Sequence, residues 1–212
     1  MDTIDYKELW ENKTMDYQAY RELMAAQAES GETSGPIQNE NLANYTKINH
    51  SRSSRLDKKT ELKPLVEERI KMVRQPQNWL VITETWCGDA AQILPILNKM
   101  TEASEFIEMS TIWRDENLDL MDRHLSNGSR AIPKLICLNE DFSEVLGEWG
   151  ARPRDAQELV EKNKVIMAKM KDKEQKSEHY AKFQIELQKW YNSNKGEHVQ
   201  HEMLVEIEKW QM

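Results

Sequence analysis

A single cysteine lies where an apolar, strand-like run gives way to a helical pattern. Cys87 follows residues 79–83 (WLVIT), and residues 90–100 then repeat apolar side chains at helical spacing. A thiol at the N-terminus of a helix faces unpaired backbone N–H groups and the positive end of the helix dipole, and both stabilise the thiolate that attacks disulfides. Gly88 would let the chain turn tightly beside the sulfur. This segment therefore predicts a redox-active cysteine.

Two carboxylates accompany Cys87. Asp89 complements the helix dipole, but its negative charge opposes a nearby thiolate, so the sequence leaves open which effect decides the pKa of Cys87. Glu84, three residues before Cys87, is either a base near the sulfur or a solvated residue at the end of the strand. We favour the solvated position for Glu84.

The other cysteine, Cys137, lies inside the apolar run 135–138 (LICL). A disulfide needs Cα atoms within about 7 Å of one another, and a residue in the middle of a strand should lie well below the rim that carries Cys87. Free cysteine is also among the residues most often buried. We therefore predict that Cys137 belongs to the core. Two cysteines in a chain of this length also argue against a fold held together by disulfides.

The elements that position Cys87 alternate between helix and strand. Strands that alternate with helices and end in a hairpin imply a sheet that is partly parallel and partly antiparallel. We find no convincing strand before Glu61 and therefore predict four strands. The predicted order is helix, strand, helix, strand, helix, two strands and a helix, over residues 62–73, 79–83, 90–100, 106–113, 118–125, 135–138, 144–148 and from Asp155 onward.

Helical segments precede and follow this α/β domain, which we place at residues 60–172. In the N-terminal extension, residues 1–59, an apolar stripe predicts a helix that frays at residues 51–54. In the C-terminal extension, residues 173–212, we expect one helix to continue to about Trp190 and a last helix to follow. Their apolar side chains need a partner surface, and we favour packing within the chain over a homodimer through the helical extensions. The stripe in the N-terminal extension consists of Leu42, Tyr45 and Ile48.

The segment 86–90 (WCGDA) resembles the Trp-Cys-x-x-Cys active site of the thioredoxin superfamily, with Ala90 in place of the second cysteine. It is similar to a bacterial branch of thioredoxin-like proteins that usually carries Cys-Gly-Asp-Ala. The resemblance covers a little over half of the chain. Three further landmarks match in register: Pro95 resembles the proline that kinks the active-site helix, Ile132-Pro133 the family's cis-proline, and residues 149–151 (WGA) the glycine segment after the hairpin.

The resemblance implies a thioredoxin-like fold, with a four-stranded mixed sheet flanked by helices and helical N- and C-terminal extensions. Parts of the family's usual mechanism are missing, because the second cysteine is Ala90, the buried carboxylate position is Val81 and its lysine partner is Thr111. A dithiol mechanism through these positions is therefore disfavoured. The implied catalytic residue is Cys87, and the implied substrate-binding residues are Trp86, Gly88, Asp89, Ile132, Pro133 and Gly150.

Two functions fit these residues. The first is a monothiol thiol–disulfide oxidoreductase, in which Cys87 attacks a disulfide and a small external thiol releases the product. The second is a non-catalytic thioredoxin-fold binding or scaffold module, which the missing carboxylate and second thiol favour. We favour the first, with a protein or a low-molecular-weight thiol or disulfide as its partner and no cofactor. A third interpretation, iron–sulfur ligation by Cys87 from two chains, is disfavoured.

Other polar residues carry weaker signals. His198 and His201 lie three residues apart, with His179 nearby, but the spacing does not match a zincin motif, so we expect surface residues and no metal. Four cations fall near the groove expected beside the proline, where they either attract an anionic thiol such as glutathione or are ordinary surface residues. These cations are Arg130, Lys134, Arg152 and Arg154.

The composition argues against several functional classes. The formal net charge of −8 opposes binding to nucleic acid, which needs a dense cationic face. No run approaches the roughly 18 to 20 apolar residues that would span a bilayer. The N-terminus lacks the basic start and apolar stretch of a signal peptide. We therefore expect a soluble, cytoplasmic protein that binds neither nucleic acid nor membranes.

Overall fold

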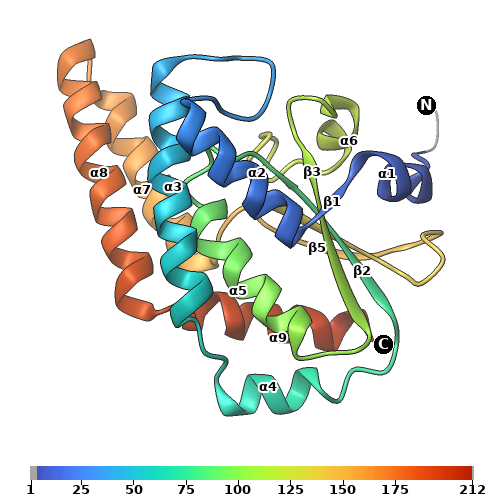
Figure 1. Ribbon diagram of the computed structural model, residues 1–212. Helices are drawn as coiled ribbons and strands as arrows, with labels where there is room; N and C mark the ends of the chain where they lie inside the picture. The colour runs from blue at the N-terminus through green and yellow to red at the C-terminus, as the bar shows by residue number, and fades with distance from the viewer. Residues whose placement is uncertain (1–3, 212) are drawn as a thin grey trace.

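A computed structural model describes residues 4–211 as a mixed α/β structure, in which helices surround one five-stranded sheet (Figure 1). The strands are β1 (Met15–Asp16), β2 (Gln77–Thr83), β3 (Ile107–Trp113), β4 (Lys134–Leu138) and β5 (Val145–Gly150). The helices are α1 (Tyr6–Lys13), α2 (Tyr17–Ser30), α3 (Glu40–Lys59), α4 (Pro64–Ile70), α5 (Ala90–Glu102), α6 (Leu118–Arg123), α7 (Arg154–Lys169), α8 (Lys173–Asn194) and α9 (Glu197–Trp210).

Strand β2 runs through the centre of the sheet. It lies parallel to β3 and antiparallel to β4, and β5 extends the sheet beyond β4, so the strand order is β1-β3-β2-β4-β5. All seven residues of β2 are buried, which accounts for the apolar run at residues 79–82 within it. The predicted α/β class with a mixed sheet, flanking helices and helical ends is confirmed, and β2 leads directly into the loop that carries Cys87.

The sheet has five strands rather than the four that we predicted. The additional strand, β1, is only two residues long and pairs antiparallel with the edge of β3, with Met15 opposite Thr111. The Thr111 hydroxyl also donates a hydrogen bond to the Met15 carbonyl oxygen, at 3.1 Å. Asp16 ends the strand and caps α2 by accepting a hydrogen bond from the Ala19 N–H at 2.7 Å. A strand this short carries no alternation that a sequence pattern could reveal.

Helix α3 packs through a different face from the one its apolar residues predicted. Its buried residues include Thr46, Asn49 and Ser53, whereas Ile48 is 47% exposed. The helix also continues through the serine-rich segment instead of fraying there. Ser53 donates a hydrogen bond to the Ala91 carbonyl oxygen at 3.2 Å, so a polar stripe of α3 is docked against the start of α5.

The C-terminal region folds back onto the rest of the chain. The prediction of a single helix from Asp155 to about Trp190 was wrong, because the backbone breaks at residues 170–172. Asp172 then caps α8 by accepting a hydrogen bond from the Gln175 N–H at 2.8 Å. Helix α9 packs against α4, α5 and β5. In Figure 1, α5 lies beside the sheet, α3 lies beyond it and α8 is farthest from the sheet. Within residues 4–211, no helix is both long and apolar enough to cross a bilayer.

Candidate active site

The sulfur of Cys87 lies between the start of α5 and the loop before β4. The Ala90 N–H points at Sγ from 3.5 Å, and the Cys87 thiol donates a hydrogen bond to the Ile132 carbonyl oxygen at 3.3 Å. The peptide bond between Ile132 and Pro133 is cis. The backbone N–H of Cys87 donates to the Glu84 carbonyl oxygen at 3.1 Å, which closes the turn that follows β2. Helix start and proline loop thus hold one sulfur from two sides.

Burial decides the protonation state of this thiol. Cys87 is only 6% exposed, and loss of solvent raises its pKa to about 12, with the negative charge of Asp89 adding to the rise. The Ala90 N–H and the charge of Arg152 act in the opposite direction but are weaker. In this conformation Cys87 is therefore a neutral thiol at physiological pH, in agreement with its role as a donor to Ile132.

Asp89 is part of a buried polar network rather than a free charge at the start of α5. Its carboxylate forms an ion pair with Arg152, with Oδ2 and Nη2 at 2.7 Å, and accepts a hydrogen bond from the Tyr191 hydroxyl of α8 at 2.9 Å. Burial, followed by the charge of Asp89, raises the pKa of Tyr191 well above its usual value, so the phenol remains a donor. The loop around Cys87 is thereby tied to the C-terminal helices.

Cys137 is a core residue, as predicted. It is fully buried, and its Cα lies opposite that of Trp79 in the β2–β4 pairing. Its Sγ donates to Gln77 Oε1 at 3.6 Å, toward the beginning of β2 and away from the end that leads to Cys87. Both thiols are free, so the described part of the chain offers Cys87 no resolving partner.

The positions beneath Cys87 also lack the usual acid–base pair of the family. Val81 is fully buried and lies opposite Thr111 in the β2–β3 register, so apolar and hydroxyl side chains occupy the two places. A residue that the sequence analysis missed, Tyr20 of α2, is 1% exposed nearby, and burial followed by interaction with Cys87 raises its pKa. Interaction of its hydroxyl with the Thr83 side chain opposes this rise.

A cavity of about 370 Å³ lies in front of Cys87. Four of the predicted substrate-binding residues line it: Trp86, Gly88, Asp89 and Ile132. Pro133 and Gly150 do not reach it. Side chains from both helical extensions complete the wall, and sequence reasoning missed these because the elements that carry them lie far from Cys87 in the chain. They are Leu42, Tyr45 and Arg52 of α3 and Tyr180, Gln184 and Gln188 of α8.

The two glycines of the predicted site have roles different from those expected. Gly88 does not adopt a positive φ, so the turn does not require glycine there. Gly150 has a φ of +120°, and a Cβ on it would lie 2.3 Å from the Pro133 carbonyl oxygen. The space beside Gly150 is thus filled by the protein's own proline loop rather than left for a substrate backbone.

Glu84 is fully buried, so its predicted solvated position was wrong. Its carboxylate accepts hydrogen bonds from the Ser34 hydroxyl and from the Asp115 N–H, the latter at 2.8 Å. Burial raises the pKa of Glu84, and these two hydrogen bonds oppose the rise. The carboxylate therefore joins the loop after α2 to the end of β3, and no contact joins it to the sulfur of Cys87.

Helix α3 holds the residue two positions before Cys87. The Asn49 side-chain amide donates to the Thr85 carbonyl oxygen at 3.0 Å, and the hydroxyls of Thr46 and Thr85 lie 3.2 Å apart. All three side chains are buried. This is the function of the polar stripe of α3, and it places the N-terminal extension directly behind the active-site loop.

Four arginines line the cavity, and three of them have carboxylate partners. Arg152 pairs with Asp89, Arg114 pairs with Asp115 at 2.8 Å, and Arg130 pairs with Asp122 at 2.6 Å. Arg114 also lies over the ring of Trp86, with its guanidinium carbon 4.8 Å from the ring centroid. The fourth arginine is Arg52.

Two of the four cations that we expected near the groove lie elsewhere. Lys134 is buried and pairs with Glu148 at 2.6 Å, and Arg154 lines a separate hollow beside α9. Arg130 and Arg152 line the cavity as expected.

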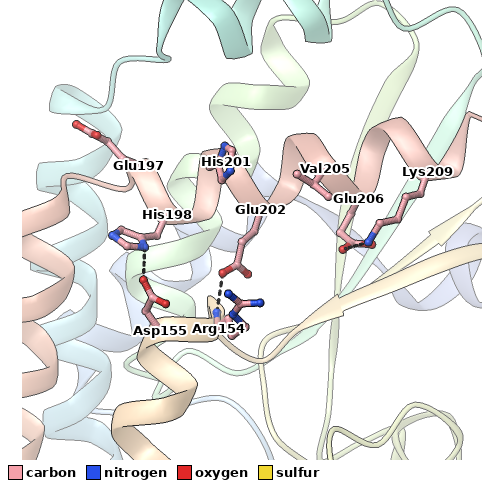
Figure 2. Close-up of a pocket in the computed structure, with 9 residues that line it drawn as sticks. All are labelled: Arg154, Asp155, Glu197, His198, His201, Glu202, Val205, Glu206 and Lys209. Carbon is pink, nitrogen blue, oxygen red and sulfur yellow. Dashed lines mark hydrogen bonds and ion pairs between the residues drawn. The ribbon is translucent and has the colours of Figure 1, made fainter.

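The hollow beside α9 is larger, at about 650 Å³, but no cysteine lines it (Figure 2). In Figure 2, His198 points toward Asp155, at 2.9 Å, and Glu202 accepts from the Arg154 N–H at 2.7 Å. His179 lies apart and is hydrogen-bonded to Asn163. Residues 4–211 contain no cluster of three metal-ligating side chains. We therefore take the cavity at Cys87 as the candidate site.

Comparison with known proteins identifies the family to which this fold belongs. A family model described as thioredoxin matches residues 35–172, well over half of the chain. The chain belongs to this thioredoxin family. The match begins within the segment that we assigned to the N-terminal extension, and it includes all of α3.

Two solved structures align with this chain over nearly its whole length. A protein of unknown function from Pseudomonas aeruginosa has a TM-score of 0.65 at 20% sequence identity, and the alignment covers 97% of this chain and 98% of that one. An HIV epitope-scaffold has a TM-score of 0.58 at 21% identity, with the same coverage of both chains. No curated protein matches the sequence. At this level of identity, the similarity establishes the fold alone.

Proposed function

We propose that this thioredoxin-family protein is a monothiol thiol–disulfide oxidoreductase, in which Cys87 carries out the exchange. The observation that supports it most directly is the position of the sulfur. It lies at the wall of a cavity, between the Ala90 N–H and the Ile132 carbonyl oxygen, with no second cysteine beside it within residues 4–211. Such a site can form a mixed disulfide but needs an external thiol to break it.

The chemistry takes place in two exchange steps. In the first, the Cys87 thiol loses its proton and attacks a substrate disulfide RS–SR. A bond forms between Sγ and one substrate sulfur, the original S–S bond breaks, and the leaving thiolate takes up a proton to become RSH. In the second, an external thiol R′SH attacks the substrate sulfur of the mixed disulfide. The product is RS–SR′, and Cys87 regains its proton.

The raised pKa makes Cys87 slow toward disulfides that it does not bind. For each unit by which the pKa rises, the fraction of thiolate at neutral pH falls tenfold. The thiolate that remains is more nucleophilic, and this offsets only about 0.4 to 0.5 of each tenfold loss in rate on a logarithmic scale. Compared with an ordinary exposed thiol, the resting site should react roughly 50- to 100-fold more slowly at neutral pH. A substrate held in the cavity gains from proximity, so the site favours bound disulfides over random encounters.

Turnover with a small neutral substrate tests the proposal. The rate of hydroxyethyl disulfide reduction by mercaptoethanol should rise with the concentration of the protein. Cys87→Ser should reduce this rate to the uncatalysed level, and Cys137→Ser, the matched control, should retain it within about twofold because its sulfur is remote from the cavity. An unchanged rate in Cys87→Ser, or no acceleration by the wild-type protein, would exclude the proposed activity.

The 6% exposure of Cys87 favours a second candidate, a non-catalytic thioredoxin-fold binding module. For such a module the cavity would bind a ligand in the same way in the wild-type protein and in Cys87→Ser, and neither would accelerate exchange. The turnover assay and a binding measurement on the same two proteins separate the two functions.

We further propose that the protein belongs to the bacterial Cys-Gly-Asp-Ala branch and acts in the cytoplasm. The one-cysteine motif at residues 86–90 supports the first assignment. The reducing cytoplasm supports the second, because it keeps thiols such as Cys87 reduced and supplies small thiols for the second step.

A further inference from the structure

Arg52 differs from the other arginines at the cavity because it has no acidic partner. Its Nη1 donates to Asn49 Oδ1 at 3.0 Å, and no carboxylate of the described chain lies within 4 Å of its guanidinium. Burial lowers the pKa of Arg52, in keeping with a cation that is partly removed from water. A partly buried cation is stabilised by a counter-ion. The charge of Asp89 raises the pKa of Arg52 and opposes the effect of burial, but this carboxylate is ion-paired with Arg152 and not with Arg52.

A second donor points at the same place. An atom attached to the Cα of Gly88 would lie 3.5 Å from Arg52 Nη1 and 3.7 Å from Gln188 Nε2. The side-chain oxygen Oε1 of Gln188 accepts a hydrogen bond from Gln92 Nε2 at 2.7 Å, and this turns Gln188 Nε2 toward Gly88. A guanidinium and an amide N–H thus converge on one volume, next to the residue that follows Cys87.

Two more donors in the cavity residues are unused. The indole Nε1 of Trp86 and the Nε of Arg152 are buried and have no hydrogen-bond partner within residues 4–211. Buried donors are normally satisfied, so each unpaired one calls for an explanation. Both atoms are closed off from solvent, so the surplus of donors over acceptors lies within the wall of the cavity, behind the donors of Arg52 and Gln188.

The enclosure limits the size of a ligand. The cavity holds about 370 Å³, near the lower end of the range for small-molecule sites. Tyr45 of α3 and Tyr180 of α8 stand at its exposed edge, at 37% and 46% exposure. Both helical extensions therefore narrow the approach to Cys87, which suits a small molecule better than a folded protein.

We propose that the cavity binds low-molecular-weight disulfides and thiols that carry a carboxylate. Arg52 is the counter-ion of that carboxylate, Gln188 is its second donor, and the sulfur of the ligand is directed to Cys87. The sulfur chemistry rests on the proposed function, whereas the selectivity for an anion does not. Because the chain has a net charge of −8, its overall field repels anions, and the selectivity must come from cations at the site itself.

Three disulfides of similar length and different charge test this proposal. Dithiodipropionate is anionic, hydroxyethyl disulfide is neutral and cystamine is cationic. For the wild-type protein, the rate of mixed-disulfide formation at Cys87, followed by intact mass, should be at least about tenfold higher with the anionic probe than with the cationic one. Added salt should reduce the difference.

Substitutions on α3 test whether Arg52 causes the preference for the anionic disulfide. Arg52→Gln should lower the rate with dithiodipropionate about tenfold more than it lowers the rate with hydroxyethyl disulfide. Arg52→Lys keeps the charge and should retain most of the preference. Arg55→Gln is the matched control, because Arg55 is exposed on the same helix, bonds to Asn192 and does not line the cavity. An equal loss with all three probes in Arg52→Gln, or no charge preference in the wild-type protein, would overturn the proposal.

Equilibrium binding separates this proposal from the proposed function. Cys87→Ser cannot exchange, but calorimetry should still detect binding of dithiodipropionate in preference to cystamine, and Arg52→Gln in that background should remove the preference. Selective binding without any mixed disulfide in the wild-type protein would contradict only the proposed function. Mixed disulfides that form equally with all probes, without selective binding, would contradict only the role of Arg52.

Discussion

Cys87 lies between two regions that are built differently. On its inner side is the sheet, where the central strand β2 is buried along its whole length among apolar neighbours. On its outer side α3 and α8 form a cap over the active-site loop, and polar contacts join the cap to the loop. These contacts are Asn49 to Thr85, Gln188 to Gln92, and Tyr191 to Asp89.

The difference indicates a division of roles. Apolar burial contributes about 25 cal/mol for each Å² removed from water, so the inner side supplies most of the stability. A typical hydrogen bond contributes only about 0.5 to 1.5 kcal/mol net. Apolar side chains of the cap are buried as well, among them Leu56, Phe183 and Leu187, so hydrogen bonds are only part of what holds it in place. The polar contacts of the cap nevertheless control the exposure and protonation of Cys87 more than they control folding.

The largest expected effect is on the inner side. Trp79 is fully buried and packs edge-on against Trp210 of α9, with ring centroids 6.3 Å apart. Trp79→Ala should lower the free energy of unfolding by about 3 to 5 kcal/mol, measured by urea denaturation. Ile48→Ala, at an exposed position of α3, should change it by less than about 0.5 kcal/mol. A loss below 1 kcal/mol for Trp79→Ala would contradict the role assigned to the sheet.

The second prediction concerns the charge network of the cap. Asp89→Asn removes a charge that raises the pKa of Cys87 and releases Arg152, which lowers it. The apparent pKa of Cys87 should fall, and alkylation at neutral pH should become about tenfold faster. Tyr191→Phe is the control, because it removes a hydrogen bond to Asp89 but keeps the charge. Equal acceleration by both variants would show that access, rather than charge, limits the reaction.

The third prediction tests the attachment of α3. Asn49→Ala leaves the Thr85 carbonyl oxygen without its donor and should weaken the local structure by about 1 kcal/mol. Alkylation of Cys87 should become roughly fivefold faster as the loop opens more often. Asn44→Ala, at an exposed position of the same helix, should have no effect. If Asn49→Ala labels at the wild-type rate, α3 does not control access to the sulfur.

The smallest effect is expected from a polar cluster on the sheet side. Hydrogen bonding to His124, followed by Lys134, lowers the pKa of Glu148 to about 2. A lowered pKa in the folded state means that this stabilisation is complete above about pH 4.5 and is lost as the pH falls toward 2. Because the side chain is 33% exposed, we expect a loss of only about 1 kcal/mol between pH 6 and 3. Glu148→Gln should reduce this part of the pH dependence, and an unchanged acid profile would contradict it.

The sheet and the position of Cys87 could be predicted from the sequence because both depend on local pattern. An apolar run of strand length marked β2, and helical periodicity marked α5 directly after Cys87. Strand β1 could not be found, because two residues carry no periodicity. The break between α7 and α8 was hidden in a long polar helix whose pattern continues on both sides.

The cap could not be predicted, because its contacts join residues distant in the chain through polar side chains. The pattern of polar residues in α3 is typical of a solvated helix face. The structure instead buries Thr46, Asn49 and Ser53 against the active-site loop and the start of α5. Arg52 carried no signal for the same reason. Glu84 was misplaced because Ser34 of the loop after α2 and the Asp115 backbone cover it, and no local pattern links these segments to the end of β2.

The most direct test of the central claim is a mass measurement on the wild-type protein with both cysteines present. After incubation with excess hydroxyethyl disulfide, intact mass and peptide mapping should show one mixed disulfide, at Cys87, which mercaptoethanol then removes. The account predicts no modification at Cys137 and no intramolecular disulfide. Loss of two hydrogens through a Cys87–Cys137 bond, or no adduct at Cys87, would contradict it.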